Sequence, residues 1–160
     1  MSAAPEESCR PAMEDDLPRL VELVDAAVTD LRAGRGGAVW ARYNARRAPY
    51  EAALRSELSS PDHHVLVGLL DNTIMGYGVA RVERLADDGL LGVVSDLYTE
   101  PGARELGIGE ATMQALVDWC EARGCFGVDS LALPGDRHSK NFFESFGLVA
   151  RAIIVHRPLS

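Results

Sequence analysis

The spacing of hydrophobic residues predicts one strand and two helices in the N-terminal third of the chain. Residues 8–13 predict a short strand, and Asp15 or Asp16 then precedes leucines and valines that recur at helical spacing over 17–31. A second helix is predicted to begin near Pro49. Its apolar face is formed by Tyr50, Ala53, Leu54 and Leu58. The Gly- and Arg-rich connection between the two helices, residues 33–49, has no clear periodicity.

The middle of the chain predicts three antiparallel strands, because apolar runs alternate there with short turn sequences. The strands cover residues 63–70, 73–85 and 90–99. Asp71-Asn72 is typical of a two-residue hairpin turn, and the sequence ADDG at 86–89 predicts the second turn.

After residue 99 the pattern changes to alternating helices and strands. Helices are predicted over 107–123 and 136–146, and strands over 126–133 and 150–157. The resulting order, β-α-α-β-β-β-α-β-α-β, predicts an α/β (or α+β) domain with a mixed, mostly antiparallel sheet and helices on both faces. The crossover into strand 126–133 should be parallel and right-handed.

Length and composition predict one soluble domain over residues 1–160, with residues 1–7 as a flexible tail. A net charge of −8 argues against binding to nucleic acid. No apolar run approaches the roughly 20 residues of a membrane span, and the acidic N-terminus does not resemble a signal peptide. The three cysteines show no metal-ligand spacing, so we expect reduced thiols, a cytoplasmic location and no metal.

The turn between strand 90–99 and the next helix has the residues of an anion site. Arg104 supplies a charge, and Gly107 and Gly109 leave room where a phosphate would approach the first amides of the helix. Taken alone, the two glycines are more typical of a tight corner than of a phosphate site. A dinucleotide fingerprint fits less well because its third glycine position holds Thr112, and no Gly-Lys-Ser/Thr of an ATP-binding loop follows.

Three separated motifs carry a resemblance to a known family. LYTEPGARELGIGEA (97–111) resembles the acetyl-CoA signature of the GNAT (Gcn5-related) N-acyltransferases. DRHSKNFFESFGL (136–148) resembles the family's Asn-x-x-Ala-x-x-Phe-Tyr-Glu-x-x-Gly-Phe element, and CRPAMEDDLPRLVEL (9–23) resembles its first strand and helix. The motifs occur in the family's order and span nearly the whole chain.

The resemblance implies a GNAT-like domain that transfers the acetyl group of acetyl-CoA to a primary amine. The acceptor would be a small molecule, a peptide N-terminus or a lysine side chain, and a homodimer is one possible assembly. The backbone of the strand would align the pantetheine arm, a bulge would expose an amide to the thioester carbonyl, and the turn would hold the pyrophosphate. The cofactor-binding residues that it implies are Leu97, Tyr98, Thr99, Arg104, Glu105, Leu106, Gly107, Ile108, Gly109, Glu110, Asp136 and Phe143.

Two positions depart from the family pattern in ways that concern proton transfer. Many relatives carry Glu-Asp where this chain has Ser95-Asp96, so Asp96 is the candidate catalytic carboxylate, acting directly or through water. A purely structural Asp96 is an equal alternative. Strand alternation places Ser95 and Asp96 on opposite faces unless a bulge intervenes. The Tyr that protonates the thiolate in many relatives is replaced by Phe143, whose ring we expect to pack beside the pantetheine.

Other polar and aromatic residues leave alternatives open. Asp136 replaces an Asn of the family and is expected to act mainly as a helix N-cap. His138 is a candidate base or thiolate partner, or an exposed residue at the helix start. Trp40 and Tyr43 could form the wall of a substrate pocket or belong to the core. The competing functional hypothesis is an acyl-CoA-binding or regulatory module with little or no turnover.

Overall fold

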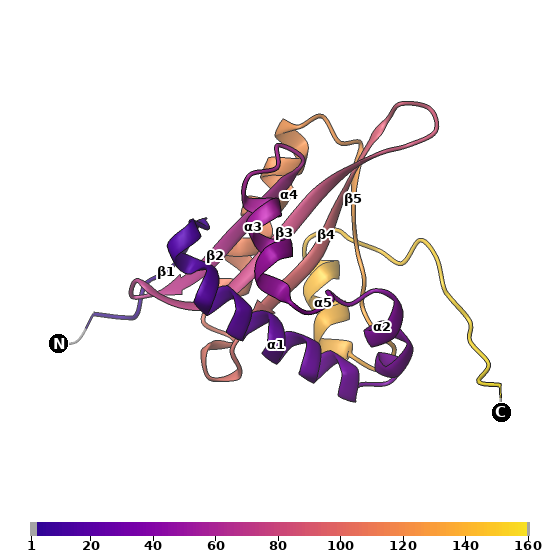
Figure 1. Ribbon diagram of the computed structural model, residues 1–160, viewed down its shortest axis with the longest axis horizontal. Coiled ribbons are helices and arrows are strands. Elements are labelled where there is room, and N and C mark those ends of the chain that lie inside the picture. Colours follow the sequence, from indigo (N-terminus) through magenta and orange to yellow (C-terminus); the bar gives the residue numbers. More distant parts are fainter. Residues whose placement is uncertain (1–2, 160) are drawn as a thin grey trace.

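The computed structural model describes residues 3–159 and shows a single domain around a five-stranded mixed sheet (Figure 1). The strands lie in their sequence order, and all neighbours are antiparallel except β4 and β5. The predicted parallel crossover is therefore confirmed. The strands are β1 (Glu7–Pro11), β2 (His63–Leu70), β3 (Thr73–Arg84), β4 (Leu90–Thr99) and β5 (Gly127–Ser130).

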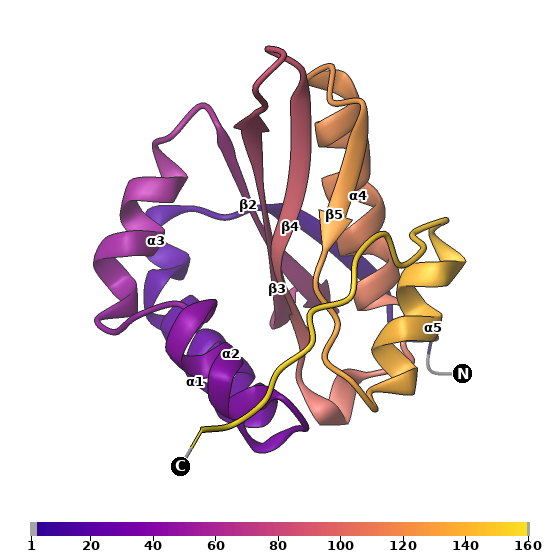
Figure 2. The ribbon, with the colours of Figure 1, turned by 90° about the vertical axis from the view of Figure 1, so that its right-hand side faces the viewer.

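Helices cover both faces of the sheet, as the sequence predicts (Figure 2). The first three helices lie on one face and α4 lies on the other. Two 3₁₀ turns precede α1 and α4, at Glu14–Asp16 and Pro101–Ala103. The helices are α1 (Leu17–Ala33), α2 (Gly37–Tyr43), α3 (Tyr50–Leu58), α4 (Ile108–Ala122) and α5 (Arg137–Ser145).

The larger core lies between α1, α3 and one face of β2 and β3. The apolar stripe of α1 is fully buried there, because residues three and four apart share one side of a helix. From α3 only Leu54 is fully buried, and Tyr77 from β3 is the largest buried side chain. This core fixes α1 and α3 beside the strands that carry the candidate site.

A second core lies under α4, which packs unusually close to the sheet. A Cβ atom at Gly68 of β2 would lie 2.5 Å from Cγ2 of Ile108, and one at Gly78 of β3 would lie 2.8 Å from Cγ2 of Thr112. The missing side chains allow the N-terminal half of α4 to approach the strands. As a result, the start of α4 is held firmly at the C-terminal end of β4.

The N-terminal segment differs from its prediction in two details. β1 begins at Glu7, and the amide of Glu6 donates to Asp71. The tail predicted over 1–7 therefore ends before these two residues. Residues 1–2 lie outside the described residues. Asp16 occupies the N-cap position of α1, but its carboxylate accepts from the Met13 amide and from Arg10 instead of from the helix. The ion pair with Arg10 ties β1 to the start of α1.

Two elements differ from the predicted order. Residues 37–43, which have no clear periodicity, form the short helix α2. The strand predicted over 150–157 is wrong, because residues 149–159 form no regular element and are exposed. An apolar, β-branched sequence favours an extended backbone, but a strand also needs a partner edge, and no backbone hydrogen bond of this segment exists within residues 3–159.

Candidate active site

The site is created by the divergence of two parallel strands. β4 pairs with β5 only from Leu91 to Val94, while β4 itself continues to Thr99 and β5 ends at Ser130. One side of the backbone over 95–99 is therefore left without a strand partner. An extended ligand with amide groups can pair with such an open edge, as a peptide does when it adds a strand to a sheet.

A β-bulge lies where the two strands separate. Val79 pairs with Asp96 and Ala80 pairs with Val94, so Ser95 is the extra residue of β4. The bulge implied by the family resemblance is present. It also cancels the alternation of side chains, because Ser95 and Asp96 now line the same cavity and the Ser95 hydroxyl donates to Asp96 Oδ1 at 2.6 Å.

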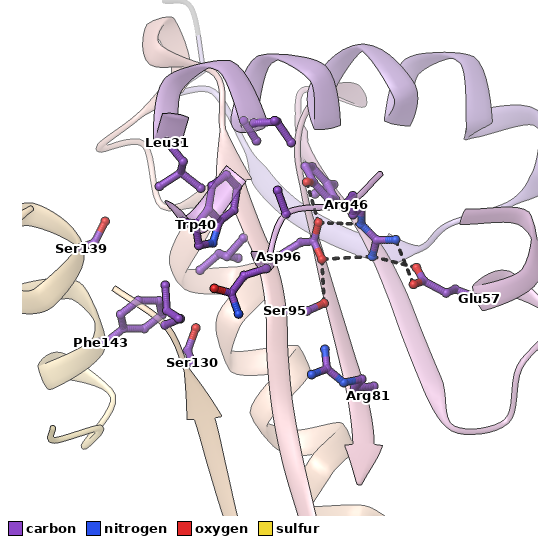
Figure 3. Close-up of a pocket in the computed structure, with 17 residues that line it drawn as sticks. Leu31, Trp40, Arg46, Glu57, Arg81, Ser95, Asp96, Ser130, Ser139 and Phe143 are labelled. Atoms are coloured by element: carbon purple, nitrogen blue, oxygen red, sulfur yellow. Dashed lines mark hydrogen bonds and ion pairs between the residues drawn. The ribbon is translucent and has the colours of Figure 1, made fainter. Parts of the chain in front are cut away.

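The cavity beside the bulge has a volume of about 230 Å³ and is bounded by both halves of the fold. Leu31 of α1 and Trp40 of α2 form one wall, and Ser130 and Phe143 face them from β5 and α5 (Figure 3). The charged residues that line it are Arg46, Glu57, Arg81 and Asp96.

Asp96 is held by four hydrogen bonds. Arg46 donates from Nε to Oδ2 at 2.8 Å and from Nη2 to Oδ1 at 3.0 Å. The Tyr77 hydroxyl donates to Oδ2 at 2.9 Å, and Ser95 supplies the fourth bond. Burial, together with the negative charge of Asp96, raises the pKa of the Tyr77 phenol well above its usual value. Tyr77 is therefore a neutral donor that points at the carboxylate from the core.

Arg46 joins Asp96 to a second acid, Glu57. Arg46 Nη1 donates to Glu57 Oε1 at 2.9 Å, and Nη2 lies 2.8 Å from Oε2, which receives no hydrogen bond of good geometry in the described structure. The side chains of Arg46 and Asp96 are only 12% and 11% exposed. Burial favours a neutral guanidine, but the charges of Asp96 and Glu57 outweigh it and raise the pKa of Arg46. The cluster is a buried ion-pair network with one cation and two acids.

The turn before α4 leaves backbone amides open at the other end of β4. Gly107 has φ +88° as the N-cap residue, and a Cβ there would lie 3.1 Å from Cγ of Glu7. The amides of Ile108, Gly109 and Glu110 have no acceptor within residues 3–159, since the first helical turn cannot bond them. A Cβ at Gly109 would meet nothing closer than Phe142, at 3.6 Å, and Gly109 and Glu110 are both at least partly exposed.

The residues predicted to bind the cofactor around the turn differ in their orientation and exposure. Arg104 does not point into the turn, since its Nε donates to the carbonyl of Thr99 at 2.9 Å and its guanidinium lies over the ring of Tyr98. Ile108 is only 1% exposed as a whole residue, so its side chain is not available to a ligand. Glu105 and Leu106 are exposed in the turn.

Two of the predicted residues belong to α5 and its N-cap, and they line different hollows, Phe143 the cavity beside Ser95 and Asp136 a second one. Asp136 is the N-cap of α5 and accepts from the amide and the hydroxyl of Ser139, so its expected capping role is confirmed. Burial opposes ionisation of Asp136, but the Ser139 hydrogen bonds leave its pKa below the usual value. Phe143 packs against Phe142 and lines the cavity. His138 is exposed and lies outside the cavity lining.

Three residues of the cluster were not predicted from the sequence. Arg46 was visible only as part of an arginine-rich segment, Glu57 as a polar position of α3, and Tyr77 as one aromatic residue of a strand. Of the two open aromatic assignments, Trp40 lines the cavity and packs against the larger core, whereas Tyr43 is exposed.

The geometry agrees with a match to a protein-family model. Residues 22–148 match the model described as the acetyltransferase (GNAT) family, which covers most of the chain. The chain belongs to the GNAT acetyltransferase family. The fold class predicted from the sequence is thereby confirmed. No curated protein sequence matches the chain.

Solved structures with low sequence identity share the GNAT fold. A mutant of a Bacillus halodurans protein has a TM-score of 0.80 at 18% identity, covering 94% of this chain and 99% of the other. An aminoglycoside acetyltransferase from an uncultured soil metagenomic sample, in complex with sisomicin, has a TM-score of 0.70 at 22% identity, covering 96% and 95%. AAC(6')-Iy, in complex with a CoA bisubstrate analogue, has a TM-score of 0.72 at 15% identity, covering 97% and 99%.

No helix within residues 3–159 is long and apolar enough to cross a bilayer. The same part of the chain has no group of three or more His, Cys, Asp or Glu side chains arranged to hold a metal ion.

Proposed function

We propose that this GNAT protein transfers the acetyl group of acetyl-CoA to a primary amine bound in the cavity beside Ser95. One observation carries the proposal: the open edge of β4 over 95–99 runs between the cavity at one end and the unbonded amides of α4 at the other. A single extended ligand can therefore place a phosphate on the helix and its far end in the cavity.

The residues of the opening suit coenzyme A. The amides of 108–110 donate hydrogen bonds to an anionic pyrophosphate, and the positive end of α4 attracts it. The backbone of Leu97 and Thr99 pairs with the amides of pantetheine, for which Arg104 must release the Thr99 carbonyl and turn toward the phosphates. Asp136 and Phe143 border the arm from the side of α5.

Acetyl-CoA supplies an acetyl group activated as a thioester. The bulge at Ser95 brings the backbone of β4 next to the thioester carbonyl. The bulge interrupts the register with β3 at Ser95, and we expect an amide there to donate to the thioester oxygen as it becomes negative. The cavity holds the amine against the carbonyl carbon, and this positioning supplies much of the rate.

Asp96 controls proton transfer without acting as a free base. Its carboxylate already accepts four hydrogen bonds, two of them from Arg46. Asp96 instead accepts a hydrogen bond from the Ser95 hydroxyl. That hydroxyl positions a water molecule, and the water takes the proton of the attacking amine. Because Phe143 has no proton to give, water also protonates the departing thiolate.

The charge balance of the cavity favours an acceptor with a single amine. Both carboxylates that line it, Glu57 and Asp96, are already paired with Arg46, and Arg81, the second cation of the lining, pairs with Glu83. The aminoglycoside complexes among the similar structures show small-molecule acceptors on this fold. In this cavity, however, a polycation would meet no unpaired carboxylate among the described lining residues.

The alternative is a module that binds acyl-CoA and turns over little or not at all, and the replacement of Tyr by Phe143 favours it. Steady release of free CoA thiol from acetyl-CoA with a panel of primary amines separates the two. Transfer predicts amine-dependent release and an acetylated amine detectable by mass. Thermal stabilisation by CoA without amine-dependent release supports the binding module, and the absence of both overturns the proposed CoA site.

A further inference from the structure

Residues 32–47, which end α1, form α2 and lead toward α3, carry positive charge that the fold does not neutralise. They include five arginines and no acid, although the whole chain has a net charge of −8. Arg46 is bound to Asp96 and Glu57. The other four are exposed, and none forms an ion pair or a side-chain hydrogen bond within residues 3–159: Arg32, Arg35, Arg42 and Arg47. We refer to residues 32–47 as the arginine segment.

Unpaired arginines are concentrated in this segment. Outside it, only Arg137 and Arg157 lack an acidic partner within the described part of the chain, and each of the others forms an ion pair. A guanidinium presents a planar fork of donors that fits a carboxylate. The arginine segment is therefore a surface whose charge is available to an anionic partner.

The arginine segment borders both hollows of the protein. Trp40 and Arg46 line the cavity beside Ser95, where Figure 3 shows them, and Arg35 lines the second hollow, of about 250 Å³. Trp40 belongs to α2, which also carries Arg42, and Arg46 is followed directly by Arg47. An acceptor that extends out of the cavity on this side meets these arginines.

α2 also exposes apolar side chains among the charges. Val39 and Tyr43 are 45% and 81% exposed, and with Arg42 they share one face of the helix because they lie three and four residues apart. A peptide can cover such a mixed face, since its carbon atoms pack on Tyr43 and its carboxylates bind Arg42. A nucleic acid fits less well, because the acidic remainder of the protein repels a long polyanion. A short acidic stretch contacts the arginine segment alone.

We propose that the arginine segment binds an acidic stretch of a peptide whose N-terminal amine enters the cavity as the acetyl acceptor, an inference that rests on the proposed function. Acids at the second to fifth positions of an extended peptide cover about 13 Å beyond the amine. The seven residues of α2 are about 10 Å long, which is a similar span. The arginine segment thus selects the sequence that follows the amine.

The cavity favours a peptide N-terminus over a lysine side chain. Asp96 is bound by Arg46 and is not a free base, so the amine must arrive neutral. An α-amine has a pKa of about 7.7–8.0 and a lysine about 10.4, so at pH 7 the α-amine is neutral roughly a few hundred times more often. Its nitrogen bonds to the acetyl carbon as the carbon–sulfur bond breaks. The amine gives one proton to water and the CoA thiolate takes one from water, so the products are an N-acetylated peptide and CoA thiol.

Fluorescence anisotropy on the full chain, without acetyl-CoA, tests the docking. The probe is a short peptide with a free N-terminus, glutamate at positions two to five and a label at its C-terminus. It should bind at least tenfold more tightly than the same peptide with glutamine at those positions, and the difference should shrink at high salt. The double variant Arg42→Glu with Arg47→Glu should lose at least tenfold in affinity. The matched control, Arg137→Glu with Arg157→Glu, changes the net charge equally at exposed, unpaired arginines and should stay within a few-fold.

Three results overturn the docking surface. The glutamine peptide binds as tightly as the glutamate peptide, the Arg42 and Arg47 variant binds normally, or the control variant loses as much affinity. Tighter binding of a single-stranded oligonucleotide, or of phosphatidylserine vesicles, through Arg42 and Arg47 overturns the peptide as the partner. Circular dichroism checks that each variant is folded, and Arg42→Gln with Arg47→Gln repeats the test without added acid.

Mass spectrometry after incubation with acetyl-CoA tests the acceptor. The acidic peptide should be acetylated at its N-terminal amine, and a version with a blocked N-terminus and an internal lysine should stay unmodified. Acetylation of the lysine alone overturns the choice of amine. Transfer to simple amines without preference for the acidic peptide overturns this inference and leaves the proposed function standing. Docking without transfer to any amine refutes the proposed function, and with it the peptide as an acceptor.

Discussion

The guanidinium of Arg46 binds the carboxylate of Asp96 through two hydrogen bonds, Nε to Oδ2 at 2.8 Å and Nη2 to Oδ1 at 3.0 Å. This pair joins the connection between α2 and α3 to the bulge of β4, two segments 50 residues apart. It neutralises the one carboxylate of β4 that faces the acceptor cavity. The pair therefore shapes this wall of the cavity, and under the proposed function it also directs the path of the protons.

Replacing Asp96 with Asn should lower both stability and turnover. The change leaves Arg46 without one of its two buried acids, and we expect a loss of about 3 kcal/mol in the free energy of unfolding. Turnover on any accepted amine should fall while the Kd of CoA stays within a few-fold, because Asp96 lies at the cavity end of β4. Denaturant unfolding, calorimetry and thiol release measure the three quantities.

Asp62→Asn is the matched control, since Asp62 also pairs with an arginine, Arg123, but at the surface. Its loss of stability should stay below about 1 kcal/mol, with turnover unchanged. If Asp96→Asn keeps full turnover across pH 6 to 9, Asp96 is structural only.

CoA should stabilise the protein, and Gly109→Glu should abolish that effect. At about 100 times its Kd, a ligand adds roughly 2.7 kcal/mol to the folded state. A Cβ at Gly109 meets only an ordinary contact, so the variant should fold, but its carboxylate would occupy the place of a phosphate. Thermal melts with and without CoA measure the difference.

Gly102→Glu adds the same side chain in the preceding 3₁₀ turn, where a Cβ would meet nothing within 4 Å. It should keep the CoA-induced shift. Normal CoA binding by Gly109→Glu would show that the phosphate does not bind at the start of α4.

Phe143→Tyr should raise turnover, and more near pH 7 than near pH 9. The ring lines the cavity, so the added hydroxyl can reach the departing thiolate. A thiol with a pKa of about 8.5 needs this proton less at high pH. A general acid typically contributes on the order of 10²-fold or more. Phe126→Tyr is the control because Phe126 is 73% exposed and does not line the cavity. Equal gains in both variants would contradict the role assigned to position 143.

Arg81→Glu should shift the acceptor preference toward polycations. Arg81 lines the cavity rim, whereas Arg84 on the same strand does not. In the unmodified protein we expect kcat/KM for simple primary amines to exceed that for an aminoglycoside by about tenfold, equivalent to about 1.4 kcal/mol. The Arg81 variant should reduce this ratio and Arg84→Glu should leave it unchanged. An unmodified protein that prefers the aminoglycoside would refute the charge argument.

The Arg10–Asp16 pair should contribute to stability only above acid pH. The Arg10 hydrogen bonds, against an opposing effect of burial, lower the pKa of Asp16 below its ordinary value of 3.8. The unfolded chain therefore binds a proton before the folded one does, and this contribution is lost as pH falls below 3.8. Asp16→Asn should be less stable at pH 7 and show a shallower loss in acid. Parallel stability curves from pH 6 to pH 2 would contradict the assignment.

Local patterns predicted most elements of this fold, for reasons seen in particular residues. The apolar stripe of α1 follows the geometry of a helix, and it is buried as predicted. Asp71 and Asn72 have φ of 47° and 64°, which their side chains tolerate better than most, so the hairpin could be read from two residues. The turn at Gly107 depends likewise on backbone conformation encoded within a few positions.

Only the tertiary structure decided the chemistry of the cavity and the fate of the last segment. Arg46 meets Asp96 because α1, α3 and the sheet pack together, and the bulge at Ser95 depends on the register with β3. Neither can be read from spacing, because ion pairing and register depend on residues distant in the chain. Residues 150–157 have the pattern of a strand, but pairing requires a second edge in space. The sequence sets the backbone conformation that a segment favours, and the packing of the fold determines which residues or strand edges lie beside it.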